Sequence, residues 1–174
     1  MTYDPSEFCV SASNAFSWLE DLGFREDGHK IHNLYGEVWW ISAMTYVEVT
    51  WDIHDQSLDV DVGPLVNGGR PSPGQYRDAS GRRVRAPLWL LLWVGSGDET
   101  AGRTLSTYSD QTRESVEQAL DRNAKALRQF GIPLLEGDFS TLPELDRADE
   151  ARIAANIARR PWGSPPRSST SSLP

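Results

Sequence analysis

The stretch that decides the fold is TYVEVTWDIH, residues 45–54, followed by SLDVDVG, residues 57–63. Apolar and polar residues alternate in both segments, which is the period of a β-strand with one buried face. The polar segment HDQS, residues 54–57, suits a hairpin connection between them. We therefore predict two antiparallel strands that turn their valines toward a core.

The register of this hairpin is predicted by matching the two apolar faces across the connection. The match places Trp51 opposite Val60. On the polar face it places Asp52 directly opposite Asp59, with Asp61 diagonal to Asp52.

Toward the N-terminus, the sequence predicts one helix and two further strands. DPSE, residues 4–7, has the form of an N-cap followed by proline at the first helical position. Apolar residues then recur at helical spacing, so we expect a helix over residues 5–22. Residues 31–35 and 37–43 are predicted as short strands separated by Gly36.

Toward the C-terminus, loops and helices are predicted. Residues 64–86 form a long loop rich in arginine, glycine and proline, and residues 95–109 form a second polar loop. PLWLLLWV, residues 87–94, is apolar throughout, which fits a short buried helix or a buried strand equally well. Helices are expected over residues 111–130 and 142–159.

These elements predict an α+β fold, in which an antiparallel β-meander of about four strands packs against an N-terminal helix and C-terminal helices. We expect a single globular domain over residues 1–160 and a disordered Pro/Ser-rich tail over residues 161–174. No apolar run is long enough to span a bilayer, and no secretory signal is visible. A cytoplasmic location without membrane contact is therefore expected.

The charge is unevenly distributed along the chain. The formal net charge is −8, and residues 1–63 contain 12 acidic but only 2 basic residues. Acidic surfaces disfavour nucleic-acid binding, because phosphate contacts need lysine or arginine. They suit a basic protein partner, whose association is accelerated by electrostatic attraction.

The polar face of the predicted hairpin is the leading candidate site. Glu48, Asp52, Asp59 and Asp61 would lie on it, and like charges that face each other across strands are destabilising unless something compensates. Three compensations stay open: water or arginines of the long loop, a basic partner surface, or a hard cation. Whether the arginines at 70–85 neutralise this face is not decided by the sequence.

Two adjacent tryptophans add an aromatic candidate. In a strand, one of Trp39 and Trp40 must face away from whatever buries the other. An outward-facing tryptophan is a frequent interface anchor, but a second layer that covers this face would explain it equally well. The predicted partner-binding residues are Glu48, Asp52, Asp59, Asp61, Trp39 and Trp40.

No motif for catalysis or for cofactor binding stands out. His29 and His32 are three residues apart, and in a strand such residues point to opposite faces, which does not favour a shared metal ion. His54 has carboxylates beside it but no evident nucleophile to activate. Cys9 is the single cysteine and is expected to be a small buried residue. We predict no catalytic residue, no cofactor and no metal.

Two segments resemble sequences of a known group of proteins: FSWLEDLGF, residues 16–24, and LLEGDF, residues 134–139. With the predicted helix–meander–helix order, the chain resembles small bacterial proteins of this arrangement, some of which are similar to immunity proteins encoded beside secreted toxins. The resemblance implies a binding role and no catalytic residues.

The lead hypothesis is a non-enzymatic cytoplasmic binding protein. In its sharpest form, it is an immunity protein that occludes a basic toxin with the acidic sheet face and an exposed Trp39 or Trp40. The alternatives are a small hydrolase that uses His54, with or without a divalent metal, and a structural or assembly subunit. The identity of the partner, any substrate and the oligomeric state are outside the reach of the sequence.

Overall fold

The computed structural model describes residues 3–158, so the predicted tail over residues 161–174 lies outside the described residues. Helices and strands follow in the order α1 (Pro5–Ala15), the 3₁₀ helix η1 (Ser17–Leu22), β1 (Arg25–His32), β2 (Tyr35–Ile41), β3 (Thr45–Asp52), β4 (Ser57–Pro64), β5 (Ala86–Pro87), α2 (Leu88–Ser96), α3 (Glu99–Leu105), α4 (Arg113–Phe130), α5 (Ile132–Leu135) and α6 (Leu142–Ala158).

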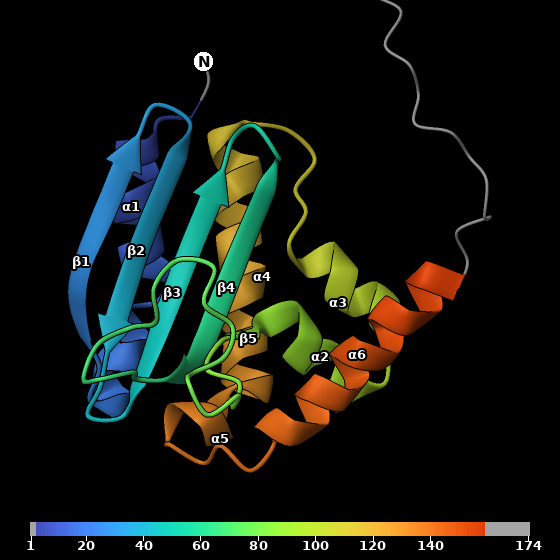
Figure 1. The fold of residues 1–174 in the computed structure, drawn as a ribbon. Coiled ribbons are helices and arrows are strands. Elements are labelled where there is room, and N and C mark those ends of the chain that lie inside the picture. Colours follow the sequence, from blue (N-terminus) through green and yellow to red (C-terminus); the bar gives the residue numbers. More distant parts are fainter. Residues whose placement is uncertain (1–2, 159–174) are drawn as a thin grey trace, which may run out of the picture.

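The five strands form one antiparallel sheet in the order β1-β2-β3-β4-β5. Helices α1 and α4 cover one face of the sheet, while α2, α3 and α6 lie beside its β4 side (Figure 1). The loop between β4 and β5 crosses the other face, which we call the outer face (Figure 1). The predicted α+β fold with an antiparallel meander is confirmed. Among residues 3–158, none of the helices has the length and apolar character that a membrane span needs.

The core lies between the sheet and its two covering helices. The alternating valines of β3 and β4 are fully or almost fully buried there, as the sequence predicts. Trp51 is at the centre, with its ring 5.3 Å from that of Phe8 and 5.4 Å from that of Tyr3. Its Nε1 donates a hydrogen bond to the Tyr108 hydroxyl at 2.8 Å, so the buried indole has no unsatisfied donor.

The first helix is shorter than predicted. Asp4 caps it as expected, because its carboxylate accepts a hydrogen bond from the Ser6 backbone at 2.7 Å. The α-helix ends at Ala15, and the Ser17 hydroxyl donates to the Asn14 carbonyl near the break. The chain continues as the 3₁₀ helix η1, so the apolar spacing up to Leu22 is kept in a tighter helix.

The predicted register of the central hairpin is wrong by two residues. Thr50, not Asp52, lies opposite Asp59, and Asp52 lies opposite Ser57. The Asp52 carboxylate accepts hydrogen bonds from the backbone of the next turn, which starts the connection one residue earlier than predicted. A shift of two residues keeps every apolar side chain on the same face, so matching the faces could not detect it.

The break between β1 and β2 also differs from the prediction. Gly36 lies inside β2 and does not separate two strands. A Cβ atom at this position would lie 2.5 Å from the ring of Phe8, so glycine allows α1 to approach the sheet closely.

The C-terminal part contains two short helices that the sequence analysis missed, α3 and α5. The apolar segment after residue 86 is the helix α2, which resolves the helix-or-strand ambiguity. The supposed polar loop over residues 95–109 contains α3, whose first N–H groups are capped by Asp98. Helix α4 is capped by Thr112, two residues later than predicted.

Candidate binding face of the sheet

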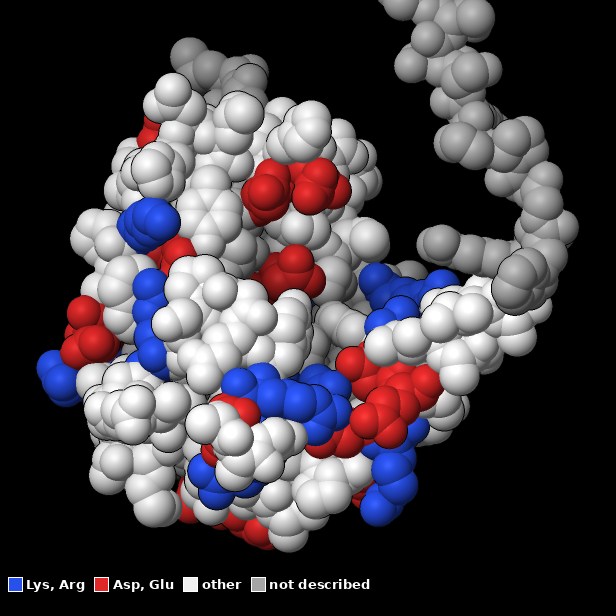
Figure 2. Space-filling view, viewed as in Figure 1, with Lys and Arg blue, Asp and Glu red and all other residues white. Residues whose placement is uncertain are grey.

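The outer face of the sheet has a covered half and an open half. The β4–β5 loop lies over the covered half, near the N-terminal end of β3 (Figure 1). The open half lies toward the β3–β4 hairpin, and acidic side chains gather there in the space-filling view (Figure 2). Each half contains some of the carboxylates that the sequence singled out.

Glu48 is in the covered half and is neutralised from two sides. One of its oxygens accepts a hydrogen bond from Arg70 Nη1 at 2.5 Å, and the other accepts one from Arg85 Nη1 at 2.5 Å. The side chain of Glu48 is only 8% exposed and that of Arg85 only 5%. Buried carboxylates need such partners, because an unpaired charge away from water is very costly.

Arg70 also contacts two residues of β2. Its Nη1 pairs with Glu37, which is buried, and its guanidinium carbon lies 3.8 Å from the centroid of the Trp39 ring. The Tyr35 hydroxyl donates to the other oxygen of Glu37 at 2.5 Å. Trp39 does face away from the core, but the loop arginine covers it.

Asp61 completes this buried cluster. It lies directly opposite Glu48 on β4 and accepts a hydrogen bond from Arg85 Nη1 at 2.8 Å. The cluster therefore contains three carboxylates, those of Glu37, Glu48 and Asp61, against two guanidinium groups. Burial raises the pKa of Glu48 and of Asp61, and Arg85 opposes the rise by favouring their charged forms.

Two more arginines of the loop bind α6 instead of the sheet. Arg83 pairs with Asp146 at 2.6 Å and with Asp149 at 3.0 Å, and its side chain is 6% exposed. Arg77 pairs with Asp146 at 2.9 Å. The open question of the loop arginines is thus answered for the covered half: Arg70 and Arg85 pair with its carboxylates and neutralise two of the three negative charges.

The predicted partner-binding residues are therefore divided. Trp40 is in the core, with its ring 5.6 Å from that of Phe16, and Glu48 is buried under the loop. Asp61 and Trp39 are half-buried. Asp61 forms an ion pair with Arg85, and the Trp39 ring is covered by the Arg70 guanidinium.

Asp52 and Asp59 lie in the open half. Within residues 3–158, neither they nor Asp55 in the hairpin turn form an ion pair with lysine or arginine. Asp55 is exposed, and the other two are half-buried. Of the predicted acidic face, Asp52 and Asp59 are thus the carboxylates without such an ion pair, and Asp55 lies beside them in the turn.

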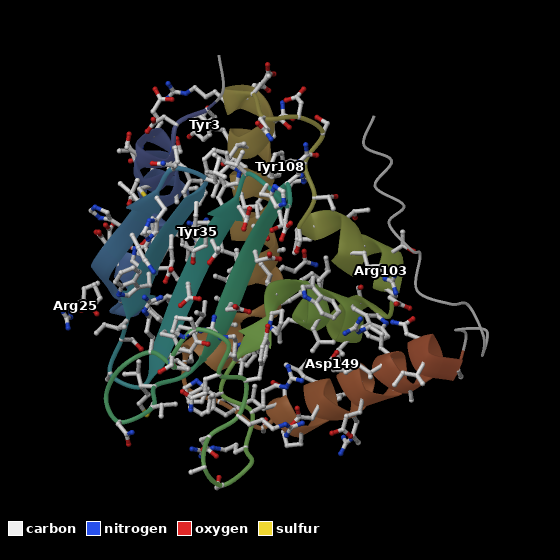
Figure 3. The ribbon with its side chains drawn as sticks, turned by 45° about the horizontal axis from the view of Figure 1, so that its top comes forward. Tyr3, Arg25, Tyr35, Arg103, Tyr108 and Asp149 are labelled. Carbon is white, nitrogen blue, oxygen red and sulfur yellow. The ribbon has the colours of Figure 1, made fainter. Side chains whose placement is uncertain are left out.

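A pocket of about 320 Å³ adjoins the open half at Asp59. Its lining comes from β4, from three helices and from the turn after α3: Asp59, Trp89, Arg103, Ser106 and Arg152. Trp89 is half-buried there, with the Arg152 guanidinium carbon 5.1 Å from its ring centroid. Figure 3 shows Tyr35 on the sheet, with Arg103 on α3 and Asp149 on α6 to one side of it. No sequence pattern predicts this pocket, because its residues are far apart along the chain.

The histidines lie on the surface and the cysteine lies in the core. His29, His32 and His54 are exposed, and the described residues contain no group of three or more metal-ligating side chains that could hold an ion. Cys9 is buried as predicted, and burial raises the pKa of its thiol to about 11.

Comparison with protein-family models, with curated proteins and with solved structures finds no match for this chain. The resemblance to immunity proteins therefore stays a prediction.

Proposed function

We propose that this protein is a non-enzymatic binding protein that recognises a basic protein partner through the open half of its outer face. The observation that carries the proposal is the contrast between two sets of carboxylates. Glu48 and Asp61 are neutralised inside the molecule, whereas Asp52, Asp55 and Asp59 have no cationic partner among the described residues. Unpaired surface charge accelerates association with a partner of opposite sign.

The pocket beside Asp59 supplies the second component of such an interface. Charges at the rim of an interface mainly set the association rate, while affinity comes from side chains that are buried on binding. Trp89 is a residue of that kind, because it is half-buried in a pocket next to the unpaired Asp59; the only cation over its ring among the described residues is Arg152, at 5.1 Å. In this proposal Trp89 takes the role that the sequence suggested for Trp39 or Trp40.

The form of this function that we favour is inhibition of a basic toxin by occlusion, in the cytoplasm. The acidic N-terminal third of the chain and the resemblance of residues 16–24 and 134–139 support it. Occlusion needs a rigid complementary surface and no catalytic group, which agrees with a charged sheet face held on a packed core.

The test compares two double variants with the same change in net charge. Asp55→Lys/Asp59→Lys reverses two charges of the open half, and Asp21→Lys/Asp121→Lys reverses two exposed charges on the helical side of the molecule. The wild-type protein is used to capture partners from a lysate of the native host, and a captured basic protein is then purified. Its association rate is measured with each variant at low and at moderate salt.

We expect the first variant to slow association at least tenfold at low salt, with a smaller effect at higher salt, and the second to change it little. Trp89→Ala is expected to accelerate dissociation. Equal association rates for the two charge variants would rule out the open half as the interface.

A further inference from the structure

One cation site on the outer face is already filled from within the molecule. The guanidinium of Arg70 lies 3.8 Å from the centroid of the Trp39 ring, and its Nη1 pairs with Glu37 and with Glu48. An aromatic face combined with two carboxylates is a typical arrangement for recognising a guanidinium group.

The walls of this site are side chains of the sheet. Glu37 and Glu48 are on the adjacent inner strands β2 and β3, and their side chains are only 4% and 8% exposed. The Tyr35 hydroxyl holds Glu37 in place. The Trp39 ring lies against Gly28 of β1, where a Cβ atom would be 2.6 Å from Cζ2 of the indole. The site is therefore preorganised by packed strands.

Arg70, in contrast, is provided by a connecting loop. It follows the tight turn Val66–Gly69, in which Gly68 has a φ of +79°, and its side chain is 21% exposed. Only the loop has to move for this side chain to leave, because no strand or helix contains Arg70.

We propose that Trp39, Glu37 and Glu48 form a guanidinium-binding site that Arg70 occupies in cis, and that an arginine side chain of a basic partner takes its place on binding. The identity of that partner rests on the proposed function, but the site itself does not. A partner arginine competes with a tethered one, whose effective concentration is on the order of millimolar. Displacement therefore needs additional contacts, and the open half with Asp59 adjoins the site on the same face.

The charge balance of the cluster favours binding of another cation when Arg70 leaves the site. With Arg70 absent, Glu37, Glu48 and Asp61 would have Arg85 as their remaining guanidinium partner within the cluster. Two negative charges in excess inside a buried cluster attract a cation strongly. Arg85 itself binds the opposite oxygen of Glu48, and the same nitrogen binds Asp61.

The test is chemical rescue of Arg70→Ala by methylguanidinium, which reproduces the missing group without a tether. The melting temperature is measured as methylguanidinium chloride is added in the low millimolar range. Arg77→Ala is the matched control, because this arginine is in the same loop but pairs with α6. Methylammonium chloride and sodium chloride at equal concentration separate guanidinium recognition from simple charge screening.

We expect methylguanidinium to raise the melting temperature of Arg70→Ala by about 3–6 °C at ten times its dissociation constant, and to leave wild type and Arg77→Ala unchanged. A second variant, Arg70→Ala/Glu37→Gln, removes one carboxylate of the site and is expected to weaken methylguanidinium binding at least tenfold.

Several results would overturn the proposal. An equal response of all variants, or an equal response to methylammonium, would show that no guanidinium site exists. An Arg70→Ala chain that is unfolded and does not regain its circular dichroism with methylguanidinium would do the same. None of these results depends on a protein partner, so they are distinguishable from a failure of the proposed function.

Discussion

Glu48 and Asp61 face each other across β3 and β4, and both accept a hydrogen bond from the same nitrogen, Arg85 Nη1, at 2.5 and 2.8 Å. Carboxylates in direct opposition on neighbouring strands repel each other. The positive guanidinium of Arg85 offsets this repulsion, because it attracts both carboxylates. Arg85 thus stabilises the pairing of these two strands, although it is 37 residues from Glu48 in the chain.

Replacement of Arg85 by methionine is therefore expected to destabilise the protein strongly. The change leaves two buried carboxylates without their common partner, and breaking a buried ion pair on one side costs about 3–5 kcal/mol. Urea denaturation measures the loss in the free energy of unfolding. Arg82→Ala is the control, because Arg82 is 64% exposed in its pair with Asp78, and it should cost no more than about 1 kcal/mol. Similar losses for the two variants would contradict a structural role for Arg85.

The pH dependence of stability should reveal the half-buried Asp61. Burial raises the pKa of its carboxyl in the folded state, so the folded chain binds this proton more tightly than the unfolded chain does. The stabilisation from that proton is complete below the unfolded-state pKa of about 4 and is lost as the pH rises through the folded-state pKa. We expect the free-energy difference between wild type and Asp61→Asn to fall as the pH rises from 4 toward neutrality.

Asp78 provides a control of opposite sign for that experiment. A hydrogen bond from the Ser80 hydroxyl holds the pKa of Asp78 below its ordinary value. Its contribution is therefore present above the unfolded-state pKa and is lost as the pH falls through the folded-state pKa. The difference between wild type and Asp78→Asn should change below pH 4, which is about the unfolded-state pKa, and stay constant above it. A constant difference for Asp61→Asn between pH 4 and 7 would show that its carboxyl is not perturbed.

Substitution of Gly36 by alanine should weaken the contact between α1 and the sheet. The added Cβ would lie 2.5 Å from the Phe8 ring, which is fully buried in the core. Overpacking of this kind costs about 1–3 kcal/mol in the free energy of unfolding. Gly69→Ala is a matched control, because nothing lies within 4 Å of the Cβ position there. It should change stability by no more than about 0.5 kcal/mol.

The thiol of Cys9 is expected to be unreactive in the folded protein. Burial excludes reagents from it and raises its pKa to about 11, so little thiolate is present at pH 8. Labelling with iodoacetamide, followed by mass spectrometry, should give almost no product until urea unfolds the chain. Rapid labelling under native conditions would mean that α1 detaches readily from the sheet.

The central strands could be predicted because alternation is a local signal of burial. The alternation of residues 45–54 and 57–63 predicts β3 and β4 and their buried face, and both are confirmed. The register could not be obtained in the same way, since two registers that differ by two residues bury the same valines. The hydrogen bonds of Asp52 in the turn are a property of a single side chain and leave no periodic pattern.

The composition of the candidate site was less accessible from the sequence. The sequence shows that an acidic segment is followed by an arginine-rich one, which indicates that some of these charges pair. It does not show which arginine pairs with which carboxylate. Arg70 and Glu48 are 22 residues apart, and Arg83 and Asp146 are 63 apart, so their pairing depends on the course of the loop in space. The pocket at Trp89 combines residues from four elements and has no motif at all.

The agreement between strand order and chain order has a consequence for how the molecule forms. Each of the strands β1–β4 pairs with its neighbour in the sequence, so the loops that must close are only a few residues long and cost little chain entropy. The pairs of Arg70, Arg77, Arg83 and Arg85 close segments of 22 to 73 residues. Nucleation is thus expected in the hairpins, with φ-values near one in the β3–β4 hairpin and near zero for the ion pairs of the loop.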